Sequence, residues 1–550
     1  MDKIIKKRDL ILLSLIVIVG AFFFSNHIYS IIGDVGREVY YPKLILDNQV
    51  LFKDIFNIFG PFAYLFNAVL YKIFGANLSV LVFVGYFTAL SVVLGTYMLA
   101  KQFLDRNTSF LIALFVSAAG IYTIHDFRYM FCPYTYAILY GLIAFIWGLY
   151  FFSKYFQTNN NKYIYLTSFL TGLACCSKYE FLLLALFLFV FLIFNKKDFK
   201  TLTLSLLCFL ASVIICFAYL FYQGLTVKDF VASLVLIKNL VATDAYQYFY
   251  KVNNGTFFSV SSIKILGLAA AKFIGFYLLF AIACKLFRKE KPITIMLFVF
   301  PLLYFIYLVY SSAGMDEILC YIPVFCSILF IIQYKTLDIR EKFIIVCTLL
   351  VSLKVFLNCN IRFYGVYFLP ALLIILFILL KKYPQLNVAF KIYTLLVLFG
   401  LLSVNIMERQ TFGIPVQNIN LYTQNSMAYK MGQAIQYIKE NTDENDTVVV
   451  FPDGLLINFE TGRPVSKQYN SAQAPYLELF KEENYIKYFT ENKPEIFILT
   501  NKGQWEYNQS RMCDSYANAL CEFIRENYKE VVIFRFNNDD EPFYIYRKID

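Results

Sequence analysis

The chain has 550 residues but only two histidines, His27 and His125, and two tryptophans. Two histidines cannot build a multi-histidine metal centre on their own, and no zinc-type cysteine spacing accompanies them. The sequence also contains no P-loop and no glycine fingerprint of a dinucleotide-binding fold. It therefore gives no sign of the common nucleotide-dependent or zinc-dependent protein classes.

Charge is also scarce, because only 16% of the residues are Asp, Glu, Lys or Arg, whereas 59% are hydrophobic. No soluble fold needs that much apolar surface, and a membrane-spanning helix needs roughly 20 apolar residues. Apolar runs of suitable length recur, and they predict a polytopic α-helical membrane protein with about thirteen transmembrane helices. The expected spans are about 10–31, 79–101, 109–124, 134–155, 163–178, 179–195, 201–222, 263–285, 293–312, 318–334, 342–358, 365–380 and 389–406.

The basic residues predict how the chain is oriented. Under this set of spans, the following basic residues fall on one side: Lys3, Lys6, Lys7, Arg8, Lys101, Arg106, Lys196, Lys197, Arg288, Lys289, Lys291, Arg340, Lys342, Lys381 and Lys382. Lysine and arginine accumulate on the cytoplasmic side of membrane proteins, so the N-terminus is predicted to be cytoplasmic. The net charge of +11 is explained by this accumulation of basic residues on one side of the membrane, not by a nucleic-acid-binding patch. No nucleic-acid partner is therefore expected. The first span is too long for a cleaved signal peptide.

The chain changes character after Arg409, where the long apolar runs stop. From Glu408 to the end, acidic residues outnumber basic ones by 21 to 15. We therefore divide it into a transmembrane domain, 1–407, and an extracytoplasmic domain, 408–550. Buried strands are predicted at 447–451, 496–499, 531–534 and 543–546, and helices at 427–441 and 514–528. Alternating strands and helices indicate an α/β domain. An outer segment at 223–262 is predicted to be a loop with a short amphipathic helix.

Ten of the twelve cysteines lie in or beside apolar runs, where a free cysteine behaves as a small hydrophobic residue. Cys513 and Cys521 lie in the C-terminal domain and could pair on an oxidising side of the membrane. On one continuous helix, eight residues span about 12 Å, which is too far for a disulfide bond. The sequence leaves the pairing open.

A cluster of Asp34, Arg37 and Glu38 directly follows the first span, in the outer loop 32–78. Charged groups are unfavourable in hydrocarbon, so such a cluster at the membrane edge indicates a polar site cut into the membrane face. Asp34 could instead cap a helix, and Arg37 could serve only to pair with a neighbouring acid. Asp54, later in the loop, is expected to cap the short helix that follows it.

Other charged residues fall on the same outer side. They are His125, Asp126 and Arg128 between the third and fourth spans, Lys178 and Glu180 at the next outer tip, Asp316 and Glu317, and finally Lys354 and Arg362. A pocket with both cations and carboxylates suits a reaction in which cations neutralise a phosphate and a carboxylate orients or deprotonates a hydroxyl. For Asp126 the alternative is a solvated loop acid, and for Lys178 an ordinary flank that extends to the interface. His125 is expected to be structural.

These motifs resemble the GT-C glycosyltransferases, especially the family 39 branch with protein O-mannosyltransferases and the lipid A aminoarabinose transferase. The segment 33–38, Gly-Asp-Val-Gly-Arg-Glu, looks like the catalytic loop. Segments 51–56, 60–64 and 70–75 resemble the two interfacial helices of that loop. The segment 172–178 looks like the family's Gly-x-x-x-x-Thr-Lys element, with serine in place of threonine. The resemblance covers about residues 8–220 well and is weaker beyond them.

The resemblance implies an integral membrane glycosyltransferase that uses a sugar on polyprenyl phosphate at the outer membrane face, with inversion. Asp34 would be the catalytic base, with Glu38 as the next candidate, and Arg37 and Lys178 would hold the donor phosphate. Asp126 matches a second acidic site, which touches a divalent metal ion in some members. The aminoarabinose branch has a lysine where this chain has Gly60-Pro61. That phosphate contact is therefore either missing or supplied from elsewhere, with Lys72 and Lys354 as the candidates, and the aminoarabinose specificity is not expected to carry over.

The implied partners are a polyprenyl-phosphate-linked sugar, membrane lipids, and a lipid, glycan or protein acceptor. The richness in Lys, Asn and Ile is compatible with an AT-rich bacterial genome, and the expected location is the inner membrane of a bacterium. A transporter or flippase of lipid-linked sugars is the main alternative, and it would favour inverted repeats and broken helices at mid-membrane. A non-catalytic membrane scaffold would leave the Asp34 cluster unexplained.

Overall fold

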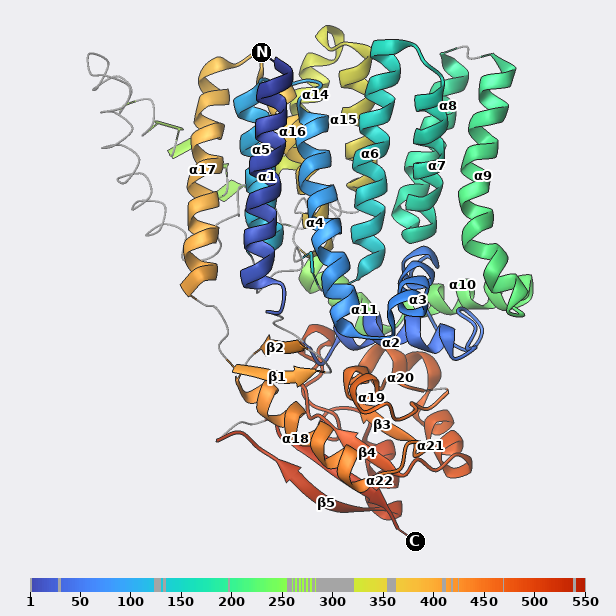
Figure 1. Cartoon of the computed structure of the whole chain (residues 1–550). Helices are drawn as coiled ribbons and strands as arrows, with labels where there is room; N and C mark the ends of the chain where they lie inside the picture. Colours follow the sequence, from blue (N-terminus) through green and yellow to red (C-terminus); the bar gives the residue numbers. More distant parts are fainter. Residues whose placement is uncertain are drawn as a thin grey trace.

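The computed structural model has a long helical bundle with a C-terminal domain, which holds the strands, at one end (Figure 1). It describes residues 2–27, 31–122, 130–131, 135–195, 198–254, 321–353, 363–407, 412–416, 419–423, 425–467, 469–537 and 541–549, with scattered positions between 260 and 282. The N-terminus and the C-terminal domain lie at opposite ends of the bundle.

The bundle helices overlap the predicted spans wherever the chain is described, although the first helix begins before the predicted residue 10 and ends before the predicted residue 31. They are α1 (Asp2–Phe24), α4 (Leu78–Ala100), α5 (Arg106–Ile121), α6 (Tyr136–Thr158), α7 (Lys162–Ser177), α8 (Leu182–Phe194), α9 (Phe199–Tyr222), α14 (Ile322–Gln333), α15 (Ile339–Val351), α16 (Leu369–Leu380) and α17 (Pro384–Met407). Four helices in the described residues are long and apolar enough to cross a membrane, namely α4, α6, α9 and the first part of α17. The chain is an integral membrane protein. The expected spans 263–285 and 293–312 lie outside the continuously described residues.

Close helix packing fixes the position of α7, which leads into Lys178. A Cβ atom on Gly172 would lie 1.9 Å from Ser212 Oγ and 2.7 Å from the carbonyl oxygen of Phe209, both on α9. Only glycine allows the two helices to approach so closely. The predicted Gly-x-x-x-x-Ser-Lys element is therefore partly a packing motif, because its first residue sets the depth at which the end of α7 lies.

Four short helices form a layer between the bundle and the C-terminal domain (Figure 1). They are α2 (Asp34–Leu46), α3 (Phe62–Phe74), α10 (Val227–Val241) and α11 (Asp244–Phe249). The expected interfacial helix near residues 60–75 is present as α3. The expectation of another helix at 51–56 was wrong, because the chain turns there: Val50 N–H donates to Asp54 Oδ2 at 2.8 Å, and Phe52 has a φ of 71°. The other helix of this loop begins at Asp34 itself.

The C-terminal domain is built on two sheets. The hairpin of β1 (Phe412–Val416) and β2 (Ile419–Thr423) is antiparallel, and a second sheet has the order β3-β4-β6-β5. Strands β3 (Val448–Phe451) and β4 (Ile496–Leu499) are parallel, while β6 (Phe543–Lys548) is antiparallel to both β4 and β5 (Tyr528–Phe534). The four predicted strands are thus confirmed. The helices are α18 (Asn425–Asn441), α19 (Leu455–Thr461), α20 (Ala474–Phe480), α21 (Glu482–Glu491) and α22 (Asn518–Asn527).

Cys513 and Cys521 form a disulfide bond, with their Cα atoms 5.6 Å apart. The expected helix at 514–528 was wrong at its start, since α22 begins only at Asn518. Cys513 lies in the turn before it with a φ of 71°, and Ala517 has a φ of 61°. These two left-handed residues fold the segment back, so that the eight-residue separation no longer corresponds to the length of a helix.

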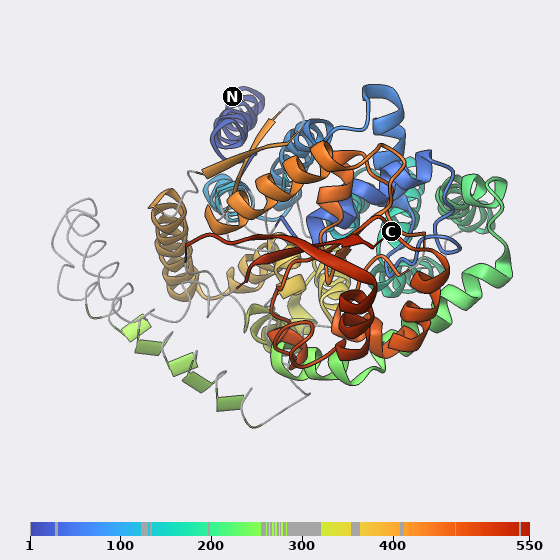
Figure 2. The same ribbon diagram turned by 90° about the horizontal axis from the view of Figure 1, so that it is seen from below.

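The C-terminal domain packs directly onto the layer of short helices (Figures 1 and 2). Leu456 and Phe459 of α19 belong to the same hydrophobic core as Val35 and Tyr40 of α2. A Cβ atom on Gly36 would lie 2.6 Å from the backbone nitrogen of Leu456. The helix that begins with Asp34 is therefore held between the membrane bundle and the C-terminal domain.

Candidate active site

Asp34 is the first residue of α2, where an acidic side chain interacts favourably with the positive end of the helix dipole. Its Oδ1 lies 2.9 Å from Nη2 of Arg37, one helical turn later. The Asp34 side chain is 44% exposed, whereas that of Arg37 is only 17% exposed. The carboxylate is thus accessible from the solvent side, while the cation behind it is held within the protein.

Arg37 is fixed on three sides. Besides the pair with Asp34, its Nε donates to Glu38 Oε1 at 3.2 Å, and its guanidinium carbon lies 5.4 Å from the centre of the Phe59 ring. Ion pairs of low exposure with a planar guanidinium are well defined in geometry. Arg37 therefore does pair with neighbouring acids, as the alternative reading expected. This pairing does not exclude that Arg37 also binds a ligand.

Glu38 is buried, with 1% of its side chain exposed. Its Oε1 accepts from the Tyr64 hydroxyl at 2.7 Å and its Oε2 from Tyr136 N–H at 2.8 Å, which ties α2 to α3 and to the start of α6. Burial raises the pKa of Glu38, although Arg37 and these hydrogen bonds oppose the rise. This environment favours a positioning role for Glu38 over the predicted catalytic one.

Lys178 directly follows α7, and its side chain is only 7% exposed. Its Nζ lies 3.3 Å from Glu180 Oε2 and 5.8 Å from the centre of the Phe59 ring. Arg37 contacts the same ring, so the structure brings the two predicted phosphate-binding cations to one aromatic side chain. A surface lysine extending to the interface would be more exposed than this.

Gly60 fixes this arrangement through the backbone. Its N–H donates to the carbonyl oxygen of Ser177 at 3.0 Å, and a Cβ atom there would lie 2.0 Å from the carbonyl oxygen of Cys176. The loop that carries Phe59 therefore lies directly against the end of α7. Where the aminoarabinose branch has a lysine, this chain has a glycine whose missing side chain permits that contact.

A cavity of about 310 Å³ opens beside Asp34 and Arg37. Its wall is shared between segments 33–56 and 233–236 and the C-terminal domain. It is lined by Gly33, Asp34, Arg37, Tyr41, Phe52, Lys53, Asp54, Phe56, Ser233, Leu236, Asp453, Gly454, Leu455, Lys467, Tyr469, Asn470, Ser471, Gln473, Tyr476, Phe480 and Tyr485. The cavity is thus an aromatic chamber with carboxylates, amides and cations on its wall, and ligand sites commonly combine these features.

The C-terminal domain contributes a second acid, Asp453, to this cavity. Its Oδ2 accepts from the side chain of Gln473 and lies 3.8 Å from Lys502 Nζ. Burial raises the pKa of Asp453, and the positive charge of Lys502 opposes the rise. Asp453 follows β3 and Lys502 follows β4, and ligands in α/β sheets bind at the carboxyl ends of parallel strands.

Sequence reasoning missed both Asp453 and Lys502, although it predicted the two strands that carry them. The available signal was a charged residue just after each buried strand. Parallel neighbours bring such residues to one edge, but nothing in the sequence indicated that the strands were adjacent or that this edge faces Asp34.

The remaining predicted residues lie elsewhere. Lys72 is exposed in the last turn of α3 and is not among the residues lining the cavity, so its phosphate role stays a prediction. Several predicted residues lie outside the described residues, namely His125, Asp126, Arg128, Asp316, Glu317, Lys354 and Arg362. Within the described part of the chain, no three His, Cys, Asp or Glu side chains converge as a metal site would require. The metal contact at Asp126 thus stays a prediction.

Residues 60–222 match the model of the dolichyl-phosphate-mannose-protein mannosyltransferase family. This segment holds α3 to α9 and includes Lys178, but not Asp34. No curated protein matches the chain.

Among similar solved structures is the oligosaccharyltransferase of Archaeoglobus fulgidus in complex with zinc and sulfate. The two structures superpose with a TM-score of 0.50 at 12% sequence identity. The alignment covers 98% of this chain and 73% of the oligosaccharyltransferase chain. The chain has the GT-C fold. ArnT from Cupriavidus metallidurans, bound to undecaprenyl phosphate, covers 98% of both chains at 11% identity, with a TM-score of 0.43. The predicted resemblance to the GT-C superfamily is confirmed at the level of the fold and of the matched family model.

Proposed function

We propose that this GT-C protein is a glycosyltransferase that moves a sugar from a polyprenyl-phosphate donor to an acceptor hydroxyl, in one displacement with inversion. The observation that carries the proposal is the Asp34–Arg37 pair on the wall of the cavity. An exposed carboxylate faces the solvent side, and two cations of low exposure lie beside one aromatic ring. Such a site separates a proton acceptor from an anion-binding region, as this reaction requires.

Asp34 acts on the acceptor hydroxyl. It accepts the proton as the hydroxyl oxygen attacks the anomeric carbon and the bond from that carbon to the phosphate oxygen breaks. A carboxylate is a weak base in water, so orientation is the larger part of its contribution. The leaving phosphate is stable as an anion and needs no separate acid.

Arg37 and Lys178 hold the donor phosphate. In the structure each cation is already paired with a carboxylate, Arg37 with Asp34 and Lys178 with Glu180. A phosphate that binds Arg37 competes with Asp34 for the guanidinium. Donor binding therefore frees the Asp34 carboxylate for the hydroxyl of the acceptor, which couples the two halves of the site.

The donor class is supported by the matched family model, whose name refers to a sugar on dolichyl phosphate. The acceptor is a hydroxyl of a lipid, glycan or protein, and we assign its binding to the edge of the C-terminal domain with Asp453, Gln473 and Lys502. Tyrosine rings such as Tyr476 and Tyr485 also line the cavity, and aromatic faces suit sugar rings. Reaction on the outer face of a bacterial inner membrane belongs to the same proposal.

The test uses cells that lack the gene and are complemented with wild-type protein, Asp34→Asn or Asp47→Asn. Asp47 is the exposed acid at the other end of α2 and serves as the matched control. Mass spectrometry of glycolipids and glycans should show a product restored by wild type and Asp47→Asn. Removal of a general base lowers rates about 10²–10⁴-fold, so Asp34→Asn should restore almost none.

The Asp34→Asn protein should still bind undecaprenyl phosphate after purification, because the cations remain. Full product formation by this variant would move the catalytic role elsewhere. A transporter would form no glycosidic product when the purified protein is incubated with donor and acceptor. A divalent metal requirement is tested separately, by adding EDTA and then Mg²⁺ or Mn²⁺ to the purified wild-type enzyme.

A further inference from the structure

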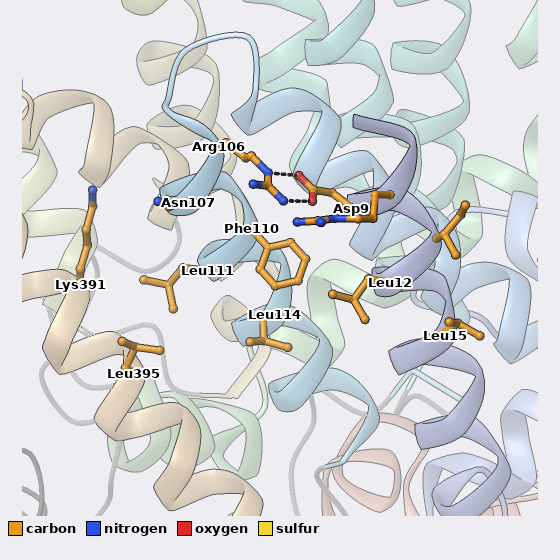
Figure 3. Close-up of a pocket in the computed structure, with 12 residues that line it drawn as sticks. Asp9, Leu12, Leu15, Arg106, Asn107, Phe110, Leu111, Leu114, Lys391 and Leu395 are labelled. Atoms are coloured by element: carbon orange, nitrogen blue, oxygen red, sulfur yellow. Dashed lines mark hydrogen bonds and ion pairs between the residues drawn. The ribbon is translucent and has the colours of Figure 1, made fainter. Parts of the chain in front are cut away.

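A second cavity, of about 700 Å³, lies at the end of the bundle opposite the C-terminal domain, far from Asp34 (Figure 3). It is a groove between three helices, with lining residues from α1, α5 and α17. Helix α5 contacts both of the other two and forms the base of the groove. The proposed glycosyltransferase reaction makes no use of it.

One end of the groove carries charge. Asp9 is buried, and it accepts from Arg106 Nη2 at 2.5 Å, from Arg106 Nε at 2.7 Å and from the Tyr97 hydroxyl at 2.7 Å. The Asp9–Arg106 pair is thus internally satisfied, and it fixes α1 against α5. Arg8 is exposed beside this pair.

Lys391 of α17 lies on the other side of the groove (Figure 3). Its Nζ is 3.4 Å from Asp105 Oδ2, a pair of two partly exposed groups with side-chain exposures of 30% and 59%. Asp105 is also occupied as the N-cap of α5, where it accepts from Thr108. This end of the groove thus has three cations and two carboxylates, and its net charge is positive. The cations are Arg8, Arg106 and Lys391, and the carboxylates are Asp9 and Asp105.

Below the charged end, the groove is apolar along its length (Figure 3). The wall consists of Ile11, Leu12 and Leu15 on α1, Phe110, Leu111 and Leu114 on α5, and Leu395 on α17. Ile11 and Leu15 are each 52% exposed and Leu12 is 46% exposed. In a membrane protein, such side chains face lipid.

We propose that this groove binds one anionic phospholipid, with its phosphate between Arg8 and Lys391 and one acyl chain along the leucines of α1 and α5. Charge complementarity selects the anionic headgroup, since a basic side chain near the membrane surface favours acidic lipids by about five-fold in affinity. The apolar wall selects a ligand with a hydrocarbon chain over a free phosphate. The bound lipid would fill the space between α1 and α17, and α17 leads into the C-terminal domain.

The experiment measures lipid retention by native mass spectrometry of the full-length purified protein after exchange into phosphatidylglycerol or phosphatidylcholine. The test variant is Arg8→Gln/Lys391→Gln, which leaves the Asp9–Arg106 pair intact. The matched control is Lys200→Gln, an exposed lysine at the start of α9, at the same end of the bundle. A second variant, Leu15→Trp, fills the groove without changing charge.

Wild type and Lys200→Gln should retain one phosphatidylglycerol per chain in preference to phosphatidylcholine. The double variant should bind it about 25-fold more weakly, at about five-fold per cation, and Leu15→Trp should exclude both lipids. Equal retention of the two lipids by wild type would overturn the proposal. So would unchanged retention in the double variant and in Leu15→Trp, or displacement of phosphatidylglycerol by undecaprenyl phosphate.

Discussion

At the residue scale, the site depends on the different environments of neighbouring charged groups. Asp34 and Glu38 both pair with Arg37, but the first is 44% exposed and the second 1%. The buried acid is saturated by hydrogen bonds from Tyr64 and Tyr136, and it orients the cation. The exposed acid remains accessible to a substrate. One arginine thus connects a buried acid to the exposed acid that we propose as the reacting group.

The burial of Glu38 predicts a pH dependence of stability. Its raised pKa means that its ionised form is less favourable in the folded protein than in the unfolded chain. The stability that it contributes is present below the ordinary pKa of about 4.3 and is lost as the pH rises through the raised value. The melting temperature of Glu38→Gln, measured relative to wild type, should therefore increase as the pH rises from about 4.5 to about 8.

The matched control for this measurement is Glu483→Gln, at an exposed acid of α21. Its melting temperature relative to wild type should change little over the same range. A difference for Glu38→Gln that stays flat, or that falls as the pH rises, would show that Glu38 is not under a desolvation penalty.

Asp453 provides a second prediction at this scale. If the strand-end edge holds the acceptor, Asp453→Asn should raise the KM for the acceptor by about ten-fold, the effect of one charged hydrogen bond. Binding of undecaprenyl phosphate should be unchanged, because Arg37 and Lys178 are not altered. Initial rates against acceptor concentration provide the measurement, and Asp443→Asn, at an exposed acid of the same domain, is the control. An unchanged KM would remove Asp453 from the acceptor site.

At the scale of elements, α2 is placed by its contact with α19. The close approach at Gly36 brings the turn with Asp34 and Arg37 to the wall of a cavity that the C-terminal domain completes. Tyr40 and Tyr71 also pack on Phe459, with ring centroids 6.4 Å and 6.1 Å apart. The turn with Asp34 and Arg37 is therefore supported from both the bundle side and the domain side.

We predict that Gly36→Ala lowers both stability and product formation. The new methyl group would lie 2.6 Å from the backbone nitrogen of Leu456, which cannot move aside like a flexible side chain. Overpacking of this kind costs about 1–3 kcal/mol. Gly432→Ala in α18 is the control, because its nearest neighbour is 3.7 Å away and alanine favours a helix. Thermal unfolding and product yield of the two variants should diverge, and equal behaviour would contradict the model of tight docking.

At the scale of the whole molecule, the polar cavity and the basic groove lie at opposite ends of one bundle (Figures 1 and 3). The N-terminus is at the end with the groove, and the C-terminal domain covers the other end. This arrangement agrees with an odd number of crossings. Which end faces the cytoplasm stays a prediction from the positive-inside rule.

Reporter fusions test that prediction. A fusion after Asn160, between α6 and α7, should report the cytoplasm, because this turn is at the same end of the bundle as the N-terminus. A fusion after Asp550 should report the outer side. Two reporters on the same side would contradict the topology, and two reporters with exchanged sides would invert it.

The apolar spans and most strands of the C-terminal domain were predictable, because hydrophobic runs and their boundaries are local properties of the sequence. The charged cluster at Asp34 stands in the sequence itself, and its function stays a prediction. The turn at 51–56 and the late start of α22 were not predictable. Both depend on residues in the left-handed conformation, among them Phe52 and Cys513. The amino-acid composition does not reveal that these residues adopt this conformation.

By itself, the sequence determined the membrane class, the change of character after residue 409 and the acid and cation at 34 and 37. The tertiary structure alone decided which distant residues meet there. It placed Lys178 against the same ring as Arg37, and it brought Asp453 to the cavity from more than 400 residues away. Hydrophobicity acts along the chain and can be read locally, whereas a shared cavity depends on how separate elements dock. That docking here rests on backbone contacts at Gly36 and Gly60, which leave no pattern in the sequence.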